Sequence, residues 1–471
     1  MQTVAWIWGI AHPTGFPAFV LGGYAFAHLV PIGLVAWRLA LFSALAMALG
    51  SSALFAAARE INLAPVTALC VAWTFASTEL AWTRGTRTEV HALALACSAL
   101  SLWLGLRFLR TRQLRLLPFW ALSLSVSLGV HPVGIFIVPL FFAWIALRMF
   151  QERSHPLFVR AFQAQAKRVL GGCLLAASIC PLLYLSLPVR SAWVSAVHAD
   201  PTLKLGLPAG RPYWDYDHPI SLSGFQREIT GSDFNVSGGF HGLLRPSTYA
   251  NIPTVFFADL NQALGGYDVL FILVVGAVAL TIRIGKPETA CLLLCGFLAV
   301  PFAASYTSES DVARYFLIAY WLAVLLFGLG LETLAKFLHP RLRQILPPIL
   351  LLLLVRAHIQ TIWPQLQFQH EDHRARQFIK RVIHVTPKNA IIIAAWGEAT
   401  PLAYAAYVDR SMQRRIVETA WAAEDAPYFA HWRKYRPIVL VSPDGQVPPN
   451  VRRFKALDKG YPQLLLIEQL Q

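Results

Sequence analysis

The sequence has few charged residues. Only 14% of its 471 residues are Asp, Glu, Lys or Arg, whereas soluble domains carry about 25%. Hydrophobic residues make up 56% of the chain, and the mean hydropathy is +0.51. This balance excludes a disordered chain and a soluble nucleic-acid-binding protein. The net charge of +15 fits the basic loops of a membrane protein instead, so we expect no nucleic-acid partner.

Cysteine is also scarce, and several functional signatures are missing. The six cysteines all lie in apolar stretches, which excludes a disulfide framework and a zinc ribbon. No basic segment precedes an apolar core at the start, so no cleavable signal peptide is expected. We predict no metal-ligating residues and no certain cofactor, and we leave open whether a divalent cation takes part.

Long apolar runs fill most of the first 362 residues. Because a helix needs about 20 apolar residues to cross a bilayer, the sequence predicts an all-α polytopic membrane domain over 1–362 with about ten spans. A large polar loop interrupts it at 190–266. The predicted spans are 36–58, 65–82, 90–108, 116–130, 133–148, 169–187, 268–284, 289–305, 315–335 and 344–362.

Basic residues assign the two sides of the membrane. Fifteen Lys and Arg residues lie in the segments that follow alternate spans, from Arg59 to Arg343. The opposite short segments hold only four, namely Arg38, Arg84, Arg87 and Arg314. The positive-inside rule therefore places the first set in the cytoplasm. It places 1–35, 83–89, 190–266, 306–314 and 363–471 outside, in a periplasm or lumen.

The last part of the chain has a different pattern. Residues 363–471 are polar enough to form a small extramembrane α/β domain on the non-cytoplasmic side. A helical apolar stripe covers 370–385, and short buried strands are predicted at 390–394, 438–441 and 464–467. No glycine-rich phosphate loop accompanies these strands. We therefore interpret the domain as a cap or an acceptor-docking module.

Polar side chains near membrane level are costly, so their positions carry information. In this chain they gather in the segments predicted to lie outside. The candidate site residues are His12, Arg84, Arg87, Glu89, His91, His131, Arg190, Trp214, Asp215, Asp217, Asp311 and Arg314. Each also has an ordinary structural interpretation, such as an ion pair at a helix end, a turn, or an arginine that reaches the interface. Their clustering on one side predicts an outward-facing site.

The order of these segments resembles a known family. Residues 9–17 (GIAHPTGFP) resemble the His-Pro-Pro-Gly-Tyr-Pro signature of a bacterial membrane family related to the eukaryotic transmembrane O-mannosyltransferase of plexin-type IPT domains. Residues 89–93, 128–131, 184–191, 214–219, 229–231 and 311–315 resemble its later motifs, in order. The resemblance implies a GT-C-type glycosyltransferase, which uses a polyprenyl-phosphate sugar as donor on the outer face of the membrane.

The resemblance also implies roles. The acceptor is a hydroxyl group of a protein Ser or Thr or of a glycan. This hydroxyl attacks the anomeric carbon of a lipid-linked mannose or similar sugar. We expect Glu89, His12 and His131 to be catalytic. Arg190 is the first candidate for the donor phosphate, followed by Arg84 and Arg87. The acceptor or supporting residues are His91, Trp214, Asp215, Asp217, Asp311 and Arg314. We expect a bacterial inner membrane with the site facing the periplasm.

Two alternatives stay open at this stage. A transporter or flippase of lipid-linked sugars would have charged or broken helices at the midplane and two similar halves, and neither is visible in the sequence. A non-catalytic scaffold of a surface-glycan complex is the other. We also expect Met1 to be an internal methionine, because the family's Asp-x-Gly-Glu motif and one span would precede it. On that expectation the chain lacks its main catalytic acid.

Overall fold

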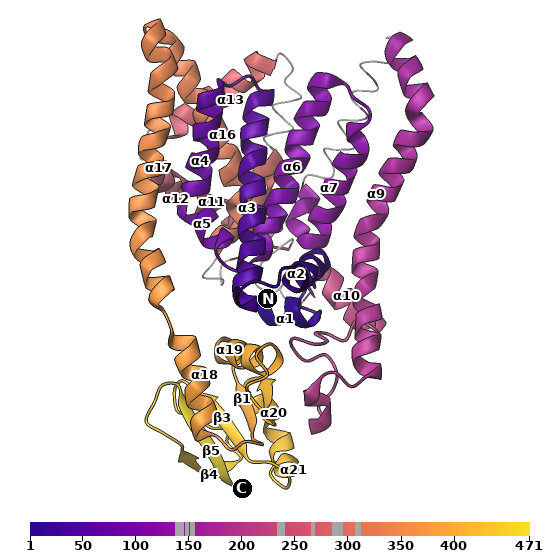
Figure 1. Ribbon diagram of the computed structural model, residues 1–471, viewed down its shortest axis with the longest axis vertical. Helices are drawn as coiled ribbons and strands as arrows, with labels where there is room; N and C mark the ends of the chain where they lie inside the picture. The colour runs from indigo at the N-terminus through magenta and orange to yellow at the C-terminus, as the bar shows by residue number, and fades with distance from the viewer. Residues whose placement is uncertain are drawn as a thin grey trace.

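The protein is a helical bundle with a small α/β domain at one end (Figure 1). This computed structural model describes residues 1–136, 146, 150, 156–232, 241–264, 269–284, 295–306 and 312–471. The predicted fold class is confirmed in its coarse form, since the chain is mostly helical with a C-terminal sheet. The chain is an integral membrane protein with apolar helices of membrane-spanning length.

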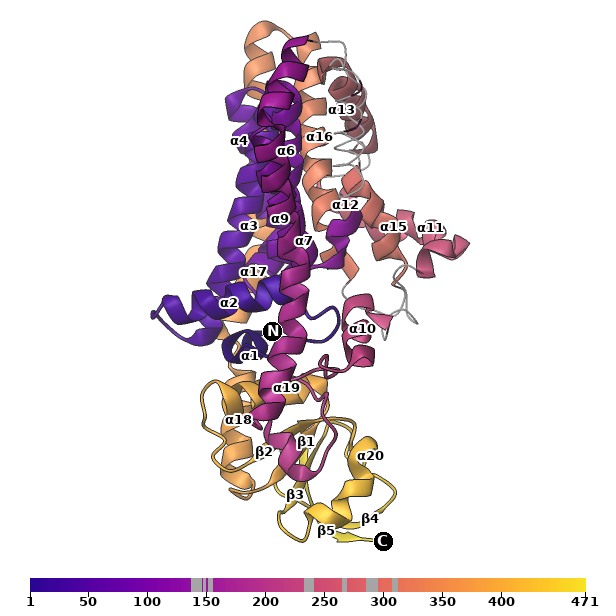
Figure 2. The ribbon, with the colours of Figure 1, turned by 90° about the vertical axis from the view of Figure 1, so that its right-hand side faces the viewer.

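The bundle contains long and short helices. They are α1 (Gln2–Ile7), α2 (Pro17–Leu29), α3 (Val35–Glu60), α4 (Pro65–Ser77), α5 (Glu79–Gly85), α6 (Val90–Thr111), α7 (Leu116–Val130), α9 (Pro156–Ala196), α13 (Val269–Ile284), α15 (Ala299–Ala304), α16 (Leu317–Leu334) and α17 (Pro340–Glu371). Proline at the first turn of α2, α4 and α17 favours helix initiation there, because that turn needs no backbone donor. Figure 2 shows α2 lying across the end of the bundle rather than along it.

The predicted count of about ten spans is not confirmed. In the described residues, five helical stretches are long and apolar enough to cross a membrane: Val35–Glu60, Val90–Thr111, Ala164–Ala196, Val312–Phe337 and Pro340–Val385. Four shorter apolar helices accompany them, at Pro17–Leu29, Pro65–Ser77, Leu116–Val130 and Leu270–Ile282. The predicted span 65–82 is broken, because Thr78 is extended and its hydroxyl caps a new helix, α5. Most of the predicted span 133–148 lies outside the described residues. Of the predicted span 289–305, the described part, 295–305, forms a 3₁₀ turn at Cys295–Leu298 and the short helix α15.

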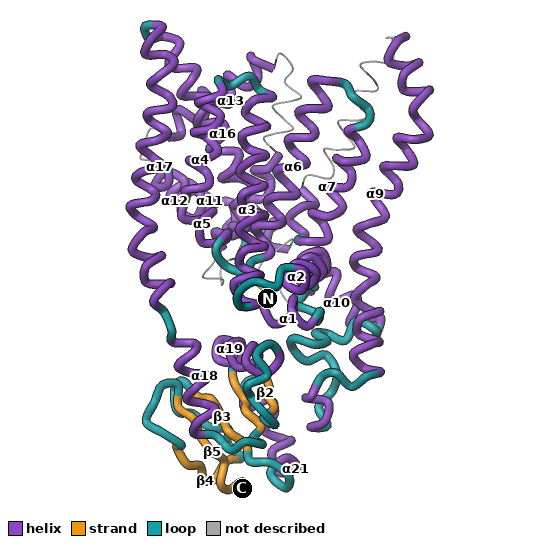
Figure 3. Tube along the Cα trace, viewed as in Figure 1, coloured by secondary structure: helices purple, strands orange, loops and turns teal. Residues whose placement is uncertain are grey.

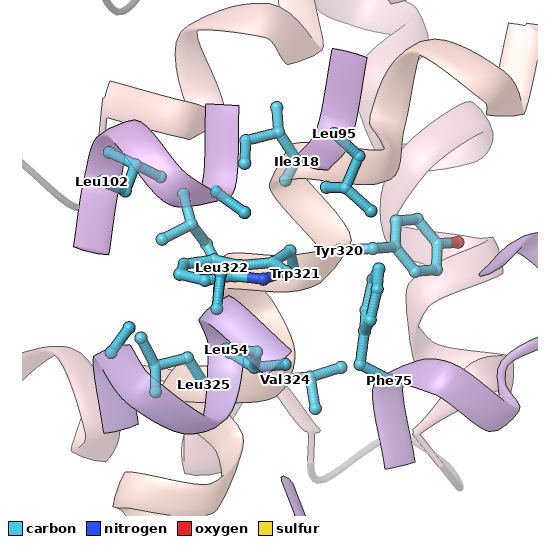
Figure 4. Packing of buried hydrophobic residues seen from close by; sticks show 14 of the residues in the cluster. Leu54, Phe75, Leu95, Leu102, Ile318, Tyr320, Trp321, Leu322, Val324 and Leu325 are labelled. Carbon is cyan, nitrogen blue, oxygen red and sulfur yellow. The ribbon is translucent and has the colours of Figure 1, made fainter. Parts of the chain in front are cut away.

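The centre of the bundle is α16. Its residues from Leu317 to Gly330 are all buried, as expected for a helix that is apolar on every face. Figure 4 shows Trp321 among side chains from several helices, including Leu54, Phe75 and Leu95. The buried indole Nε1–H of Trp321 donates to the Gly50 carbonyl oxygen at 2.9 Å. This bond satisfies the one polar atom of the side chain and ties α16 to α3.

Glycine allows α13 to approach α16 closely. A Cβ atom at Gly276 would lie 2.0 Å from the Leu326 carbonyl oxygen, and one at Gly330 would lie 2.2 Å from that of Ile272. Any larger residue at either position would force the helices apart, which is the usual reason for small residues between membrane helices.

The predicted outer loop 190–266 is only partly a loop. Helix α9 continues to Ala196, and α10 (Leu222–Thr230) lies near the C-terminal domain end of the bundle (Figure 2). Residues 246–263 form α11 (Pro246–Ile252), a π-helical turn and α12 (Ala258–Ala263). Phe256 and Leu260 of this stretch are buried in the bundle core. Their apolar character drives the second half of the segment into the bundle.

The strands, orange in Figure 3, all lie in the C-terminal domain. They form a five-stranded sheet in the order β2-β1-β3-β5-β4. The strands are β1 (Ile391–Ala394), β2 (Ile416–Thr419), β3 (Ile438–Ser442), β4 (Val451–Ala456) and β5 (Gln463–Leu470), and the helices are α18 (Arg374–Val385), α19 (Trp396–Tyr407), α20 (Ala422–Asp425) and α21 (Phe429–Trp432). Strands β1, β2 and β3 are parallel, and β5 is antiparallel to both neighbours. The three predicted strands are confirmed, whereas β2 and β4 were not predicted.

The first half of the 190–266 segment docks on this domain. The Trp432 indole donates to the Leu205 carbonyl oxygen at 2.7 Å. The buried carboxylates of Glu418 and Asp425 lie 3.2 and 3.1 Å from the Arg211 guanidinium. The proposed boundary at residue 362 falls inside α17, which runs unbroken from Pro340 to Glu371. A single helix therefore joins the bundle to the domain.

Candidate functional site

The site lies at the end of the bundle that faces the C-terminal domain. It is built around Glu89, which precedes the first turn of α6. The Ser43 hydroxyl of α3 accepts a hydrogen bond from the Glu89 backbone N–H at 3.0 Å. The Glu89 carboxylate accepts hydrogen bonds from His91 Nδ1 at 2.8 Å and from Arg84 Nη1 at 3.3 Å. The backbone and side chain of Glu89 are therefore both held in place.

These partners keep Glu89 ionised. Burial alone would raise the pKa of its carboxyl group, but the His91 hydrogen bond and the charges of His91, Arg84 and Arg314 outweigh burial and lower the pKa to about 2. A carboxylate with so low a pKa is a weak proton acceptor near neutral pH. Its chemical contribution is a fixed negative charge.

Three histidines surround the same space. The His91 and His131 rings have centroids 4.9 Å apart, and the Tyr315 ring lies 5.2 and 5.6 Å from them. Phe16 stacks on His131 at 5.7 Å and contacts the edge of His12 at 5.2 Å. The segment with His12 follows α1, so residues far apart in sequence meet here.

Hydrogen bonds assign the histidine tautomers. His12 Nδ1–H donates to the Pro13 carbonyl oxygen at 3.0 Å, which leaves Nε2 as the acceptor atom. His131 Nδ1 accepts from the Val133 backbone N–H at 3.2 Å, which leaves the proton on Nε2. Burial lowers the pKa of His12 to about 4, against the hydrogen bond to Pro13. His12 is therefore neutral near pH 7 and can accept a proton.

These groups line one cavity of about 200 Å³, which we call the central cavity. Its walls are the segment after α1, the start of α6, the end of α7, the end of α10, α15 and a 3₁₀ turn at Val312–Phe316. The charged and titratable side chains that line it are His12, Glu89, His91, His131, Tyr306, Arg314 and Tyr315. The Arg314 guanidinium donates to the Tyr315 hydroxyl at 3.0 Å and lies over its ring. Arg314 is therefore the arginine that lines this cavity within the described chain.

Arg190 has a different place from the one predicted. Its guanidinium donates to the carbonyl oxygens of Ile7, at 2.9 Å, and Trp8, and it packs over the ring of Trp193 at 4.0 Å. It does not line the central cavity. Arg190 instead satisfies carbonyl groups at the end of α1, so it positions the segment that carries His12.

The two other predicted phosphate ligands, Arg84 and Arg87, line a second cavity of about 630 Å³, which we call the side cavity. Glu79, Asp259 and His358 also line it. Arg84 is buried and bonds to Glu89, whereas Arg87 is exposed. Arg84 therefore lies between the two cavities.

The predicted residues of the 214–218 stretch lie outside the central cavity and brace the outer segment. Trp214 accepts a hydrogen bond from the Ile10 backbone at its carbonyl oxygen, and Asp217 accepts one from Arg227 Nε at 3.1 Å. Asp215 accepts a hydrogen bond from His218 Nδ1 at 2.6 Å. The same nitrogen faces the Ser191 hydroxyl at 3.4 Å, so these residues do not form a catalytic relay. Asp311 lies outside the described residues.

Glycine permits the contact between this stretch and the His12 segment. A Cβ atom at Gly9 would lie 1.8 Å from the Tyr213 carbonyl oxygen. Only glycine fits there, so the two segments pack backbone to backbone.

Sequence reasoning missed two residues near the central cavity. Glu228 is fully buried in α10, with its carboxylate against Gly15. Trp396, in the first turn of α19, has its ring centroid 6.3 Å from that of His12. Only the position of Trp396, directly after a predicted buried strand, offered a signal. Among the described residues, no cluster of three His, Cys, Asp or Glu side chains could hold a metal ion.

Comparison with known proteins agrees with this architecture. Residues 1–154 match the N-terminal domain family of the protein O-mannosyl-transferase TMEM260. This match confirms the family resemblance seen in the sequence. A search of curated proteins gives no match.

Two solved structures share the fold over nearly the whole chain. ArnT from Cupriavidus metallidurans in the apo state is 12% identical with a TM-score of 0.51, and ArnT bound to undecaprenyl phosphate is 11% identical with the same TM-score. Each alignment covers 96% of this chain and 87% of ArnT. The oligosaccharyltransferase of Archaeoglobus fulgidus is 13% identical with a TM-score of 0.45, over 90% of this chain. This chain spans 59% of that protein's length.

Proposed function

Because the N-terminal third of the chain matches the TMEM260 family and the whole chain has the ArnT fold, we propose that this protein is a GT-C-type membrane glycosyltransferase. It moves mannose or a similar sugar from a polyprenyl-phosphate donor to a hydroxyl group, on the periplasmic face of a bacterial inner membrane. The acceptor is a protein Ser or Thr or a glycan. The observation that carries the proposal is the central cavity, in which a carboxylate, neutral histidines and an arginine converge.

The proton of the acceptor hydroxyl goes to His12. The acceptor oxygen attacks the anomeric carbon, the bond from that carbon to the phosphate oxygen breaks, and polyprenyl phosphate leaves. His12 Nε2 is the acceptor atom of a neutral imidazole in the cavity wall, so it can take the proton as the new bond forms.

Arg314 receives the leaving phosphate in this scheme. It lines the central cavity, and a guanidinium binds phosphate oxygens with two parallel hydrogen bonds. His131 Nε2–H supplies a further donor in the same cavity. This assignment replaces Arg190, whose guanidinium is occupied by the carbonyl groups of α1.

Glu89 acts through its charge. Glycosyl transfer develops positive charge on the sugar ring in the transition state, and a fixed carboxylate in a partly desolvated cavity stabilises that charge. Its bonds to Arg84 and His91 hold the carboxylate at the cavity wall.

The test is to supply radiolabelled polyprenyl-phosphate mannose to membranes that contain the protein. Label transferred to a macromolecule supports the glycosyltransferase. Translocation of the intact donor without transfer would indicate a flippase instead. The absence of both transfer and translocation would indicate a scaffold. Membranes without the protein provide the background.

A further inference from the structure

An aromatic cluster contacts His12, which lines the central cavity. The Trp396 ring is stacked on Tyr213, with centroids 6.1 Å apart and planes at 16°. Tyr216 contacts Trp396 edge to face at 6.4 Å, and His12 does so at 6.3 Å. The C-terminal domain supplies Trp396, the 190–266 segment supplies the tyrosines, and the N-terminal segment supplies His12. We call these four residues the aromatic platform.

The platform lies at a favoured binding position of the α/β fold. Trp396 follows β1 by two residues, at the carboxyl end of the strand. The chain passes from β1 to β2 on one side and then to β3 on the other, and β1 is parallel to both. Connections thus reverse direction at β1, and ligands of parallel α/β sheets bind at the carboxyl ends of strands at such points. Figure 1 shows α19 between this sheet and the bundle.

One side of the platform is open. Trp396 is 49% exposed, although Tyr213 stacks on its ring and Tyr216 contacts it edge to face. Beside it, a Cβ atom at Gly397 would meet no atom within 4 Å. A rigid indole held by neighbouring rings, with open space next to it, presents a flat apolar face with little conformational entropy to lose on binding.

We propose that the aromatic platform binds a pyranose ring of a saccharide acceptor. The proposal rests on the proposed function and specifies its acceptor class. A pyranose has an apolar C–H face that packs on an indole, while its hydroxyl groups stay available to polar partners. With the ring stacked on Trp396, a hydroxyl points toward His12, the group that accepts its proton.

A peptide acceptor fits this surface less well. Extended peptides commonly add a strand to a sheet edge or fill a groove with pockets for side chains. The platform lies at strand ends, and β1 is an inner strand with both edges paired. The adjacent Glu398, in the first turn of α19, adds a carboxylate of the kind that accepts hydrogen bonds from sugar hydroxyl groups.

The test measures binding, without transfer. The purified full-length protein in lipid nanodiscs is applied to a printed array of hexose oligosaccharides and to an array of Ser- and Thr-rich peptides. We expect wild type to bind oligosaccharides and Trp396→Ala to bind them about tenfold more weakly, which equals about 1.4 kcal/mol. Trp396→Phe keeps a smaller aromatic face and should retain most of the binding. Trp421→Ala is the matched control, because Trp421 is 70% exposed in the same domain and is not part of the platform.

Three outcomes would overturn the proposal. They are binding of peptides rather than oligosaccharides, equal losses in Trp396→Ala and Trp421→Ala, and no binding of wild type to either array. The Glu89→Gln variant separates this proposal from the proposed function. Its binding should persist while transfer falls by about 100-fold. Wild-type protein that binds oligosaccharides through Trp396 but transfers no sugar would contradict only the transferase.

Discussion

At the residue scale, the chemistry depends on which groups are charged and which are neutral. Glu89 stays ionised because Arg84 and His91 donate to it, whereas burial keeps His12 neutral near pH 7. Both groups line the central cavity. The proton that His12 gains during transfer therefore enters a cavity that also holds a fixed negative charge.

The pH dependence of transfer should report on His12. Its pKa of about 4 means that the imidazole becomes protonated, and unable to accept a proton, only as the pH falls through about 4. We therefore expect kcat/KM to be flat from pH 7 to 5 and to decline near pH 4, and His12→Ala to lose most activity. A decline centred near the ordinary histidine value of 6.5 would contradict the assignment.

At the element scale, two contacts hold the site together from a distance. Arg190 satisfies carbonyl groups at the end of α1, and Arg211 joins the 190–266 segment to the C-terminal sheet. Neither residue lines the central cavity. Each positions a segment that supplies residues to the wall of the cavity.

Substitution of Arg190 should loosen the segment with His12. In Arg190→Ala the carbonyl groups of Ile7 and Trp8 lose their donor, so backbone amides of residues 7–16 should exchange hydrogen faster. Arg190→Lys should restore protection only in part, because an ammonium lacks the planar fork that makes both bonds and stacks on Trp193. Unchanged exchange in Arg190→Ala, by mass spectrometry of the full-length protein, would remove this positioning role.

Glu418 should make the docking of the C-terminal domain sensitive to pH. Burial and the charges of Asp425, Asp200 and Glu424 together raise the pKa of Glu418 to about 8, although Arg211 lowers it. Because this pKa exceeds the ordinary value of about 4.5, stability is highest below pH 4.5 and falls as the pH rises toward 8. We expect β2 amides to lose protection progressively between pH 4.5 and 8, after correction for intrinsic exchange, and Glu418→Gln to abolish that loss. The same loss in Glu418→Gln would contradict the assignment.

Local patterns predicted much of the architecture, and long-range packing decided the rest. The one-sided polar residues led to Glu89, His12 and His131, which line one cavity. The strand at 390–394 was visible as a run of isoleucines, but β2 was not, because Glu418 interrupts its apolar pattern. The bonds of Arg190 to the carbonyl oxygens of Trp8 and Ile7 could not be predicted, because these residues lie 182 and 183 positions away in the sequence.

At the scale of the whole molecule, the N-terminus and α10, which supply residues of the central cavity, lie at the end of the bundle that faces the C-terminal domain (Figure 1). The distribution of basic residues predicts that this end faces away from the cytoplasm. In a cysteine-free background, Ser232→Cys and Lys434→Cys should react with a membrane-impermeant thiol reagent in cells with a permeable outer membrane. Both positions are exposed, as labelling requires.

The control for this labelling is Arg341→Cys, at the start of α17. It should react only after lysis, because the basic segments are predicted to face the cytoplasm. Labelling of Arg341→Cys in intact cells, with protection of the other two positions, would reverse the topology.

The most direct test of the account is sugar transfer by the purified protein in proteoliposomes, with labelled polyprenyl-phosphate mannose and a membrane extract as the source of acceptor. We predict transfer by wild type, accompanied by release of polyprenyl phosphate in equal amount. Glu89→Gln and Arg314→Ala should each lower the rate by about 100-fold, as expected for loss of a charge that stabilises the transition state. Glu79→Gln, in the side cavity, should have little effect. Transfer at the wild-type rate by Glu89→Gln and Arg314→Ala would contradict the central claim that the reaction takes place in the central cavity.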